Sequence, residues 1–329
     1  MPGIDQLDVE LLLAHVLHSR REHLLVHPDQ TLSLTAVHRF RSLIKKRGEG
    51  MPLAYLVGSK EFFGLNFIVN KFVLVPRPET ELIVEMALDR LQESDFSNQT
   101  SDFRKPKSES RSPKAILVDL GTGSGCIPIA IMKTLETKKQ KNTENKKTLV
   151  RVIGTDISQW ALRVARKNAR RHGVDITFLH GNLLEPIIKT YNPTSPAGGL
   201  KPITYNLIIT ANLPYLTEEQ YASEPSIQSE PKSALVAKNN GLALYEKLLK
   251  QIQTLISSFP HFFISCFFEI DPSQSRRITS LIQDYLPGAK VEIKTDLAGR
   301  ERVVVIRTLK TRKTKNTKTL VSMFRCFNV

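Results

Sequence analysis

The chain contains a short apolar strand that leads directly into a glycine-rich turn. Residues 118–125 read Val-Asp-Leu-Gly-Thr-Gly-Ser-Gly, and residues 127–132 continue as a predicted helix. Glycines let the backbone bend sharply and approach a ligand closely, and the free N–H groups at the start of a helix point back into such a turn. We therefore expect a strand–turn–helix unit that binds a nucleotide-like cofactor.

After this turn, apolar strands and amphipathic helices continue to alternate, which is typical of an α/β fold with a mostly parallel sheet and helices on its faces. Helices are predicted over 158–171, with Ser158 as the N-cap, and over 241–257 and 273–285. The predicted loops are polar and cover 97–114, 134–148 and 190–203. The predicted strands cover 115–120, 150–155, 176–180, 205–210, 262–269, 289–295 and 302–307.

The first 50 residues follow a different pattern. Apolar residues at helical spacing predict helices over 5–18 and 34–46. Gly48, Gly50 and Pro52 then interrupt the pattern, and residues 61–75, rich in Phe and Val, look strand-like. The N-terminal part is therefore expected to be a small helical unit followed by a strand-like linker.

The spacing of the glycines favours S-adenosylmethionine over a dinucleotide as the cofactor. A dinucleotide fold requires Gly-x-Gly-x-x-Gly, but here the third glycine comes one residue early and Cys126 stands in the expected position. The carboxylate of Asp119 would repel a pyrophosphate and would hold a cationic amino-acid group. The alternative is a glycine-rich connection without a ligand. The expected cofactor contacts in this segment are Asp119, Gly121, Thr122, Gly123, Ser124 and Gly125.

Two later strand ends offer further contacts to the cofactor. Asp156 ends the second predicted strand, where a carboxylate accepts hydrogen bonds from ribose hydroxyls or caps the helix that follows. Asn182 follows the third strand, and its amide is a candidate partner for the adenine edge, with Leu183 covering the ring. A plain turn at Gly181 and Asn182 explains the same residues.

The strand over 205–210 is followed by Asn212-Leu213-Pro214-Tyr215. An amide or aromatic amine nitrogen is a poor nucleophile because its lone pair is delocalised. The Asn212 side-chain oxygen and the Leu213 carbonyl each accept one N–H, which orients the nitrogen and raises its electron density, while Tyr215 lies against the planar group. We therefore predict methyl transfer to a planar NH2 group. The catalytic residues are Asn212, Leu213, Pro214 and Tyr215, and Asn212 also touches the cofactor.

Nearly all of the net charge of +15 comes from three stretches, 101–114, 133–148 and 307–325. Two interpretations stay open. The stretches are solvated basic loops and a tail, or they make a weak electrostatic contact with RNA or the ribosome. The Arg and Lys residues over 163–171 fit a solvated helix face.

Composition also limits the location of the protein and its other ligands. No apolar run is long enough to span a membrane, and the N-terminus lacks the layout of a signal peptide. His15, His18 and His27 have no carboxylate or cysteine neighbours at ligand spacing, so no metal is predicted. The cysteines are odd in number and widely spaced, which indicates the reducing cytoplasm; they are Cys126, Cys266 and Cys326.

Several segments resemble the release-factor glutamine N5-methyltransferases, the PrmC or HemK family, over roughly residues 5 to 307. Residues 76–81, Pro-Arg-Pro-Glu-Thr-Glu, form the most family-specific string. The acceptor motif over 212–215 is similar to the family's Asn-Pro-Pro-Tyr. The other similar segments are 8–17, 52–58, 61–64, 230–235, 241–242 and 296–302.

The resemblance implies a class I S-adenosylmethionine-dependent methyltransferase fold, a seven-stranded, mostly parallel sheet preceded by a small helical domain. The implied activity is methylation of the glutamine side chain in the Gly-Gly-Gln loop of peptide-chain release factors, which takes part in translation termination. The implied domains are a helical substrate-recognition domain, a linker with a strand hairpin, a catalytic domain and a basic tail, over 1–50, 51–80, 81–309 and 310–329.

The chain departs from the family pattern at two positions. Leu213 replaces the first proline of the acceptor motif but retains its carbonyl, and Asn182 stands where an acidic residue is frequent. Asn-Leu-Pro-Tyr also occurs in ribosomal RNA adenine dimethyltransferases. Two alternative activities therefore stay open, adenine-N6 methylation of RNA or DNA and glutamine methylation of a ribosomal protein.

Overall fold

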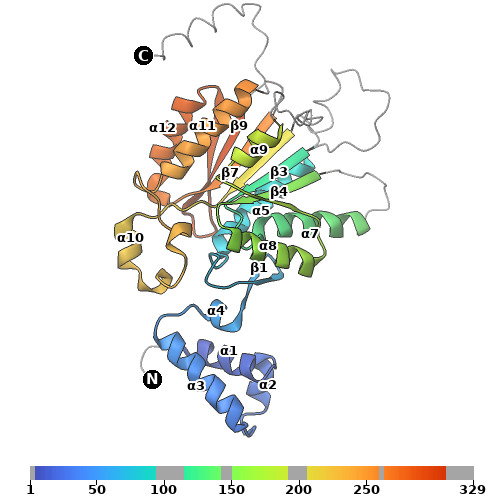
Figure 1. Ribbon diagram of the computed structural model, residues 1–329, viewed down its shortest axis with the longest axis vertical. Coiled ribbons are helices and arrows are strands. Elements are labelled where there is room, and N and C mark those ends of the chain that lie inside the picture. Colours follow the sequence, from blue (N-terminus) through green and yellow to red (C-terminus); the bar gives the residue numbers. More distant parts are fainter. Residues whose placement is uncertain (1–3, 94–114, 142–149, 192–205, 259–262, 309–329) are drawn as a thin grey trace, which may run out of the picture.

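The computed structural model describes residues 4–93, 115–141, 150–191, 206–258 and 263–308 (Figure 1). The seven strands predicted for the main sheet are confirmed, each to within one residue at either end. They are β3 (Ala115–Leu120), β4 (Val150–Asp156), β5 (Thr177–His180), β6 (Asn206–Ala211), β7 (Phe263–Glu269), β8 (Ala289–Thr295) and β9 (Glu301–Thr308).

The strand order is β5-β4-β3-β6-β7-β9-β8. Neighbouring strands from β5 to β7 are parallel, and β9 runs antiparallel to both β7 and β8. From β3 the chain adds strands outward on one side and then returns to β6 on the other. This reversal leaves a crevice beyond the carboxyl ends of β3 and β6, where open α/β sheets bind their ligands.

Helices cover both faces of the sheet. One face packs against α5 (Glu81–Gln92), α7 (Cys126–Lys141) and α8 (Gln159–His172). The other face packs against α9 (Glu185–Tyr191), α11 (Ala243–Ser258) and α12 (Ser275–Tyr285). Alternate β3 residues enter the two cores, with Leu117 on the first face and Val118 on the second. The α/β fold with helices on both faces is thus confirmed.

The predicted loop over 134–148 is wrong at its start, because α7 continues to Lys141. Lys, Glu and Gln are good helix formers, and Leu135 still packs against the core. Helix α5 was not predicted, although its apolar residues recur at helical spacing. Most of the predicted loops over 97–114 and 190–203, and the basic tail over 310–329, lie outside the described residues.

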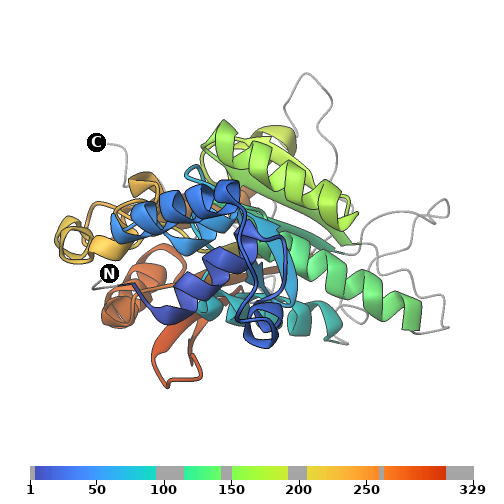
Figure 2. The ribbon, with the colours of Figure 1, turned by 90° about the horizontal axis from the view of Figure 1, so that it is seen from below.

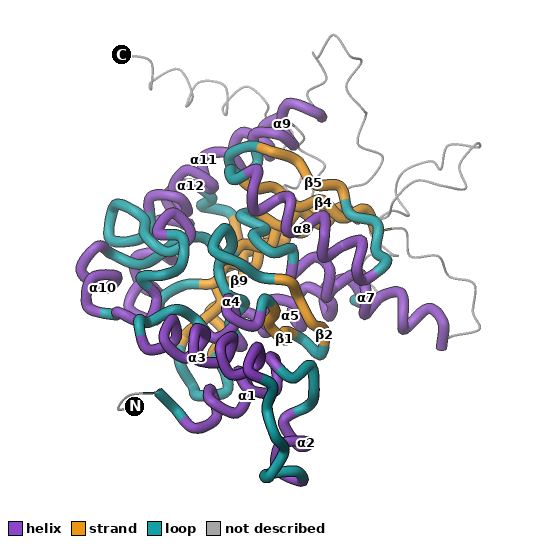
Figure 3. Tube along the Cα trace, turned by 60° about the horizontal axis from the view of Figure 1, so that its bottom comes forward, coloured by secondary structure: helices purple, strands orange, loops and turns teal. Residues whose placement is uncertain are grey.

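The N-terminal unit contains the two predicted helices, α1 (Gln6–Val16) and α3 (Leu34–Gly48), and two shorter ones, α2 (Arg21–Val26) and α4 (Leu53–Val57). Figure 2 shows these helices in front of the sheet when the molecule is seen from below. The strand-like segment over 61–75 is only partly a hairpin, of β1 (Ser59–Phe62) and β2 (Leu65–Ile68), which lies beside the N-terminal helices in Figure 3.

The remaining elements are short and lie in the segments that connect the longer helices and strands. They are the helix α10 (Glu218–Ser223) and the 3-10 turns η1 (Pro78–Thr80), η2 (Pro225–Ile227), η3 (Lys232–Ala234) and η4 (Pro272–Gln274). No helix among the described residues is both long and apolar enough to cross a bilayer.

Asn168 on α8 joins the hairpin to the main body. Its side chain is fully buried and accepts a hydrogen bond from the Ile68 N–H at 2.8 Å. It also donates to the carbonyls of Ile68 at 3.0 Å and Ser124 at 2.9 Å. One carboxamide thus satisfies three backbone groups, two on β2 and one in the glycine turn.

We expect Asn168→Ala to lower the free energy of unfolding by about 2–4 kcal/mol, because it leaves buried backbone groups without partners. Urea unfolding followed by circular dichroism measures this change. Lys167→Ala is the matched control, an exposed neighbour on the same helix, and should change the value by less than about 0.5 kcal/mol. Equal effects of the two substitutions would contradict the assignment of Asn168 as a structural link.

Candidate active site

The glycine turn lies at the carboxyl end of β3, where the strand order reverses. Gly121, Gly123 and Gly125 have φ angles of 65°, 54° and 80°, which other residues rarely adopt. A Cβ atom on Gly121 would lie 3.2 Å from Cδ2 of Leu213. The turn therefore runs very close to the loop that carries the acceptor motif.

A cavity of about 650 Å³ opens above this turn, and its volume is typical of a cofactor site. The structure brings most of the predicted cofactor residues together around it. Backbone amides, a carboxylate and apolar side chains line it, which is the set that a nucleoside carrying an amino-acid group requires. The predicted residues on its wall are Gly121, Thr122, Gly123, Ser124, Asp156, Asn182, Leu183 and Asn212.

Asp156, at the end of β4, both supports the turn and lines the cavity. One carboxylate oxygen accepts the Gly123 N–H at 2.9 Å and the other accepts the Ser158 N–H at 2.8 Å. Burial raises the pKa of this carboxyl group, and the two backbone hydrogen bonds oppose that shift. Each oxygen keeps a further lone pair, so the capping role does not prevent Asp156 from accepting ribose hydroxyls.

Asp119 was expected to hold the cationic group of the cofactor, but its carboxylate is buried beneath the turn and is not part of the cavity wall. Its Oδ1 accepts the Thr210 hydroxyl at 2.8 Å, which ties β3 to β6. Burial raises the pKa of Asp119 to about 7. Gly125 also lies below the wall, where a Cβ would come within 3.0 Å of Ile129 Cδ1. Both residues support the cavity from underneath.

Asn182 and Leu183 lie on the cavity wall at the end of β5. Leu183 has a φ of 55°, an uncommon conformation for a bulky residue, and its carbonyl accepts the Thr155 hydroxyl at 2.9 Å. Backbone strain of this kind occurs where surrounding contacts fix a loop for a ligand. Their contact with adenine stays a prediction.

Asn212 is held by Thr80. The Asn212 Nδ2 donates to the Thr80 hydroxyl at 2.9 Å. Its Oδ1 accepts no hydrogen bond from the described part of the chain, and neither does the Leu213 carbonyl. Two acceptors on consecutive residues are therefore available at the edge of the cavity.

Leu213 replaces the family's proline without loosening the loop. Its side chain is buried in the core, and its N–H, which a proline lacks, donates to the Tyr245 hydroxyl at 3.4 Å. Tyr245 is fully buried, and its own hydroxyl donates to the Glu269 carbonyl. A hydrogen bond and packing thus hold the backbone that a ring would otherwise fix.

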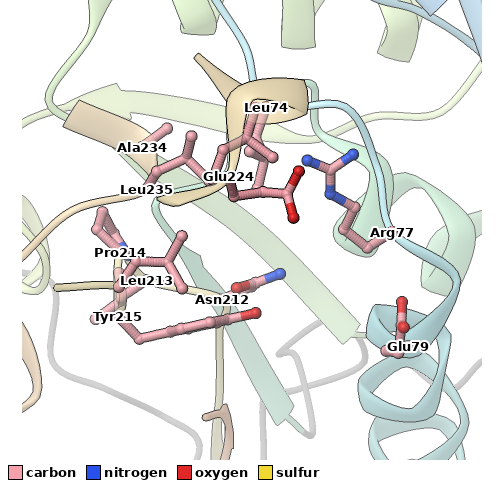
Figure 4. A pocket seen from close by; sticks show the side chains of 12 residues that line it. Leu74, Arg77, Glu79, Asn212, Leu213, Pro214, Tyr215, Glu224, Ala234 and Leu235 are labelled. Atoms are coloured by element: carbon pink, nitrogen blue, oxygen red, sulfur yellow. The ribbon is translucent and has the colours of Figure 1, made fainter. Parts of the chain in front are cut away.

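A second pocket, of about 450 Å³, adjoins the first at the acceptor motif. Asn212, Leu213 and Pro214 line both cavities, and Tyr215 lines only this one. Figure 4 shows these side chains facing Arg77 and Glu79 across the pocket. The two spaces therefore adjoin at the acceptor motif, and a group that enters the second pocket lies beside Asn212.

The string over 76–81 supports this boundary through several contacts. Arg77 pairs with Glu230 at 2.5 Å, and the same carboxylate accepts the Val75 N–H at 2.9 Å. Glu79 pairs with Arg300 at 3.4 Å. The segments over 76–81, 230–235 and 296–302, far apart in the sequence, therefore meet beside the acceptor motif.

Glu269 was not predicted as a site residue, and Gly241 was included only as part of a segment that resembles the family. Glu269, buried at the end of β7, accepts the hydroxyls of Thr80 at 2.7 Å and Tyr215 at 3.1 Å. Gly241 has a φ of 81°, and a Cβ there would collide with the Tyr215 carbonyl and the Gln274 amide. The sequence signal for Glu269 was a glutamate at the end of an otherwise apolar strand. For Gly241, the local sequence does not indicate that a side chain would meet the Tyr215 carbonyl.

Comparisons with known proteins identify the family of the chain. Residues 3–58 match the family model of the PrmC N-terminal domain. The chain is 31% identical to the release factor glutamine methyltransferase of Bacillus cereus and 30% identical to that of Bacillus anthracis, in each case over 92% of both chains. Among solved structures it is similar to a human methyltransferase 10 domain-containing protein, with 15% identity, a TM-score of 0.44, and coverage of 84% of this chain and 99% of that one. On the sequence matches, which span nearly the full length of each relative, the chain belongs to the release factor glutamine methyltransferase family.

Proposed function

We propose that this protein transfers a methyl group from S-adenosylmethionine to the side-chain amide nitrogen of the glutamine in the Gly-Gly-Gln loop of peptide-chain release factors. The observation that carries the proposal is that Asn212 and Leu213 line both a cofactor-sized cavity and the second pocket that adjoins it. The relatives that match this chain almost end to end are named release factor glutamine methyltransferase.

S-adenosylmethionine, when bound, supplies an electrophilic methyl group on a positively charged sulfur. The residues of this chain bind and orient the acceptor. Asn212 Oδ1 and the Leu213 carbonyl each accept one N–H of the glutamine amide, which fixes the plane of the group and aims the nitrogen lone pair. The two acceptors also stabilise the positive charge that develops on the nitrogen. The nitrogen is positively charged directly after the transfer, and this cationic amide is acidic enough to lose one of its two protons to water, which leaves the neutral N-methyl amide.

The second pocket suits a peptide loop. Its wall combines charged side chains, Arg77, Glu79 and Glu224, with the apolar Leu74 and Ile227. A loop rich in glycine presents bare backbone N–H and C=O groups, which such side chains bind. The glutamine of the loop then extends past Tyr215 towards Asn212.

An adenine amine and a glutamine on a ribosomal protein present the same pair of N–H groups, so the test must separate these acceptors. A weak contact with RNA or the ribosome is a further proposal supported by net charge alone, because most of the basic stretches lie outside the described residues. We also infer a cytoplasmic location. It is supported by Cys126 and Cys266, which are free and buried.

Purified protein and labelled S-adenosylmethionine should label a release factor and should not label the same factor with its loop glutamine changed to alanine. Mass spectrometry should place one methyl group on that glutamine. Parallel reactions contain ribosomal RNA and whole ribosomes. Label confined to RNA or to a ribosomal protein would replace the proposed acceptor with the corresponding alternative.

Asn212→Ala should lower kcat for release-factor methylation by at least about 100-fold, because it removes one of the two groups that orient the nitrogen. Calorimetry should find the Kd for S-adenosylmethionine within about threefold of the wild-type value. Joint loss of binding and turnover would mean that Asn212 supports the fold instead of the acceptor.

Asp156→Ala should raise the Kd for S-adenosylmethionine by about tenfold or more, the equivalent of losing one or two hydrogen bonds to a charged acceptor. Asp175→Ala is the matched control, an exposed carboxylate outside the cavity wall. Equal affinities of the two variants would remove Asp156 from the cofactor site.

A further inference from the structure

A chain of three hydrogen-bonded side chains ends at the acceptor motif. Glu269, at the end of β7, accepts the Thr80 hydroxyl at 2.7 Å, and Thr80 accepts Asn212 Nδ2 at 2.9 Å. Glu269 and Thr80 are only 1% and 3% exposed. Neither residue belongs to the acceptor motif, and they come from segments 189 residues apart in the sequence.

The direction of each hydrogen bond in this chain follows from its first member. A carboxylate only accepts hydrogen bonds, so the single Thr80 proton is directed to Glu269. The Thr80 oxygen then has only lone pairs left for Asn212, so the amide must turn its NH2 end towards Thr80. The side-chain oxygen of Asn212 is therefore not hydrogen-bonded to Thr80 and stays available to accept a hydrogen bond.

This orientation matters because a carboxamide has two ends of similar shape and opposite polarity. In the flipped orientation the NH2 group of Asn212 would face the NH2 group of the substrate amide. Those groups repel, and no acceptor would be left at that position. The side-chain amide must therefore be fixed before the substrate arrives.

We propose that Glu269 and Thr80 are positioning residues that lock Asn212 with its oxygen directed to the substrate nitrogen. This inference rests on the proposed function, because it assumes an NH2 group as the acceptor. A second contact anchors the carboxylate, since Tyr215 donates its hydroxyl to the other oxygen of Glu269 at 3.1 Å. The same glutamate thus holds both the amide and the aromatic ring of the acceptor motif.

The test compares Thr80→Val, which removes the hydroxyl at nearly constant shape, with Thr80→Ser, which keeps it. Release-factor methylation gives kcat and KM, calorimetry gives the Kd for S-adenosylmethionine, and thermal unfolding gives Tm. We expect Thr80→Val to lower kcat about 10- to 100-fold, because Asn212 becomes free to flip. Thr80→Ser should keep kcat within about threefold, and both should keep the cofactor Kd within about threefold.

Glu269→Gln tests the other end of the chain and serves if Thr80→Val does not fold. Glutamine offers a donor and an acceptor, so it no longer fixes the direction of the Thr80 hydroxyl. We expect a loss in kcat of about tenfold with the cofactor Kd within about threefold.

Three results would overturn the inference. The first is a kcat that is undiminished in both Thr80→Val and Glu269→Gln. The second is a kcat that falls equally in Thr80→Ser and Thr80→Val. The third is a Kd for S-adenosylmethionine that rises in the variants in parallel with the loss of kcat. A wild-type enzyme that does not label the release factor would instead overturn the proposed function, so the two failures are distinguishable.

Discussion

The hydrogen bond between Thr210 and Asp119 ties the carboxyl ends of β6 and β3 together, and the site depends on this junction. It joins the strand that ends in the glycine turn to the strand that ends in the acceptor motif, at 2.8 Å. Because the strand order reverses between them, the two strands adjoin although they are far apart in the chain. The Gly121 backbone can then approach Leu213 as closely as the absence of a side chain allows. Cofactor and acceptor groups meet here as a consequence of topology.

The sequence predicted those parts of the site that one strand and its following loop determine. Glycine spacing, Asp156 at a strand end and the acceptor motif are local patterns, and the structure brings the glycine turn, Asp156 and residues 212–214 to one cavity wall. Asp119 shows the limit of this reasoning, because a residue on a strand faces either the cavity or the core and its position in the chain does not say which. Thr80 and Glu269 show another limit, since their roles exist only through partners 132 and 189 residues away.

Leu213 illustrates how a family position can change without loss of geometry. A proline fixes φ by covalent means and leaves no N–H to satisfy. A leucine at the same place has more conformational freedom and one more donor, and a buried donor without a partner costs free energy. Tyr245 accepts that donor, and burial of the leucine side chain beside the glycine turn restricts the loop further. The substitution is therefore consistent with the same acceptor carbonyl.

The buried carboxylates at this site lower the stability of the fold but fix the direction of the hydrogen bonds around them. Burial raises the pKa of both Asp119 and Glu269, so in each case the charged form is disfavoured by the interior. Apolar residues of similar size would avoid that cost. They would not, however, accept hydroxyl protons, and the direction of hydrogen bonds to Thr210, Thr80 and Tyr215 would be undefined. An enzyme that binds one end of an amide group specifically needs contact residues whose own orientation is fixed. Carboxylates behind those residues fix it, because they only accept hydrogen bonds.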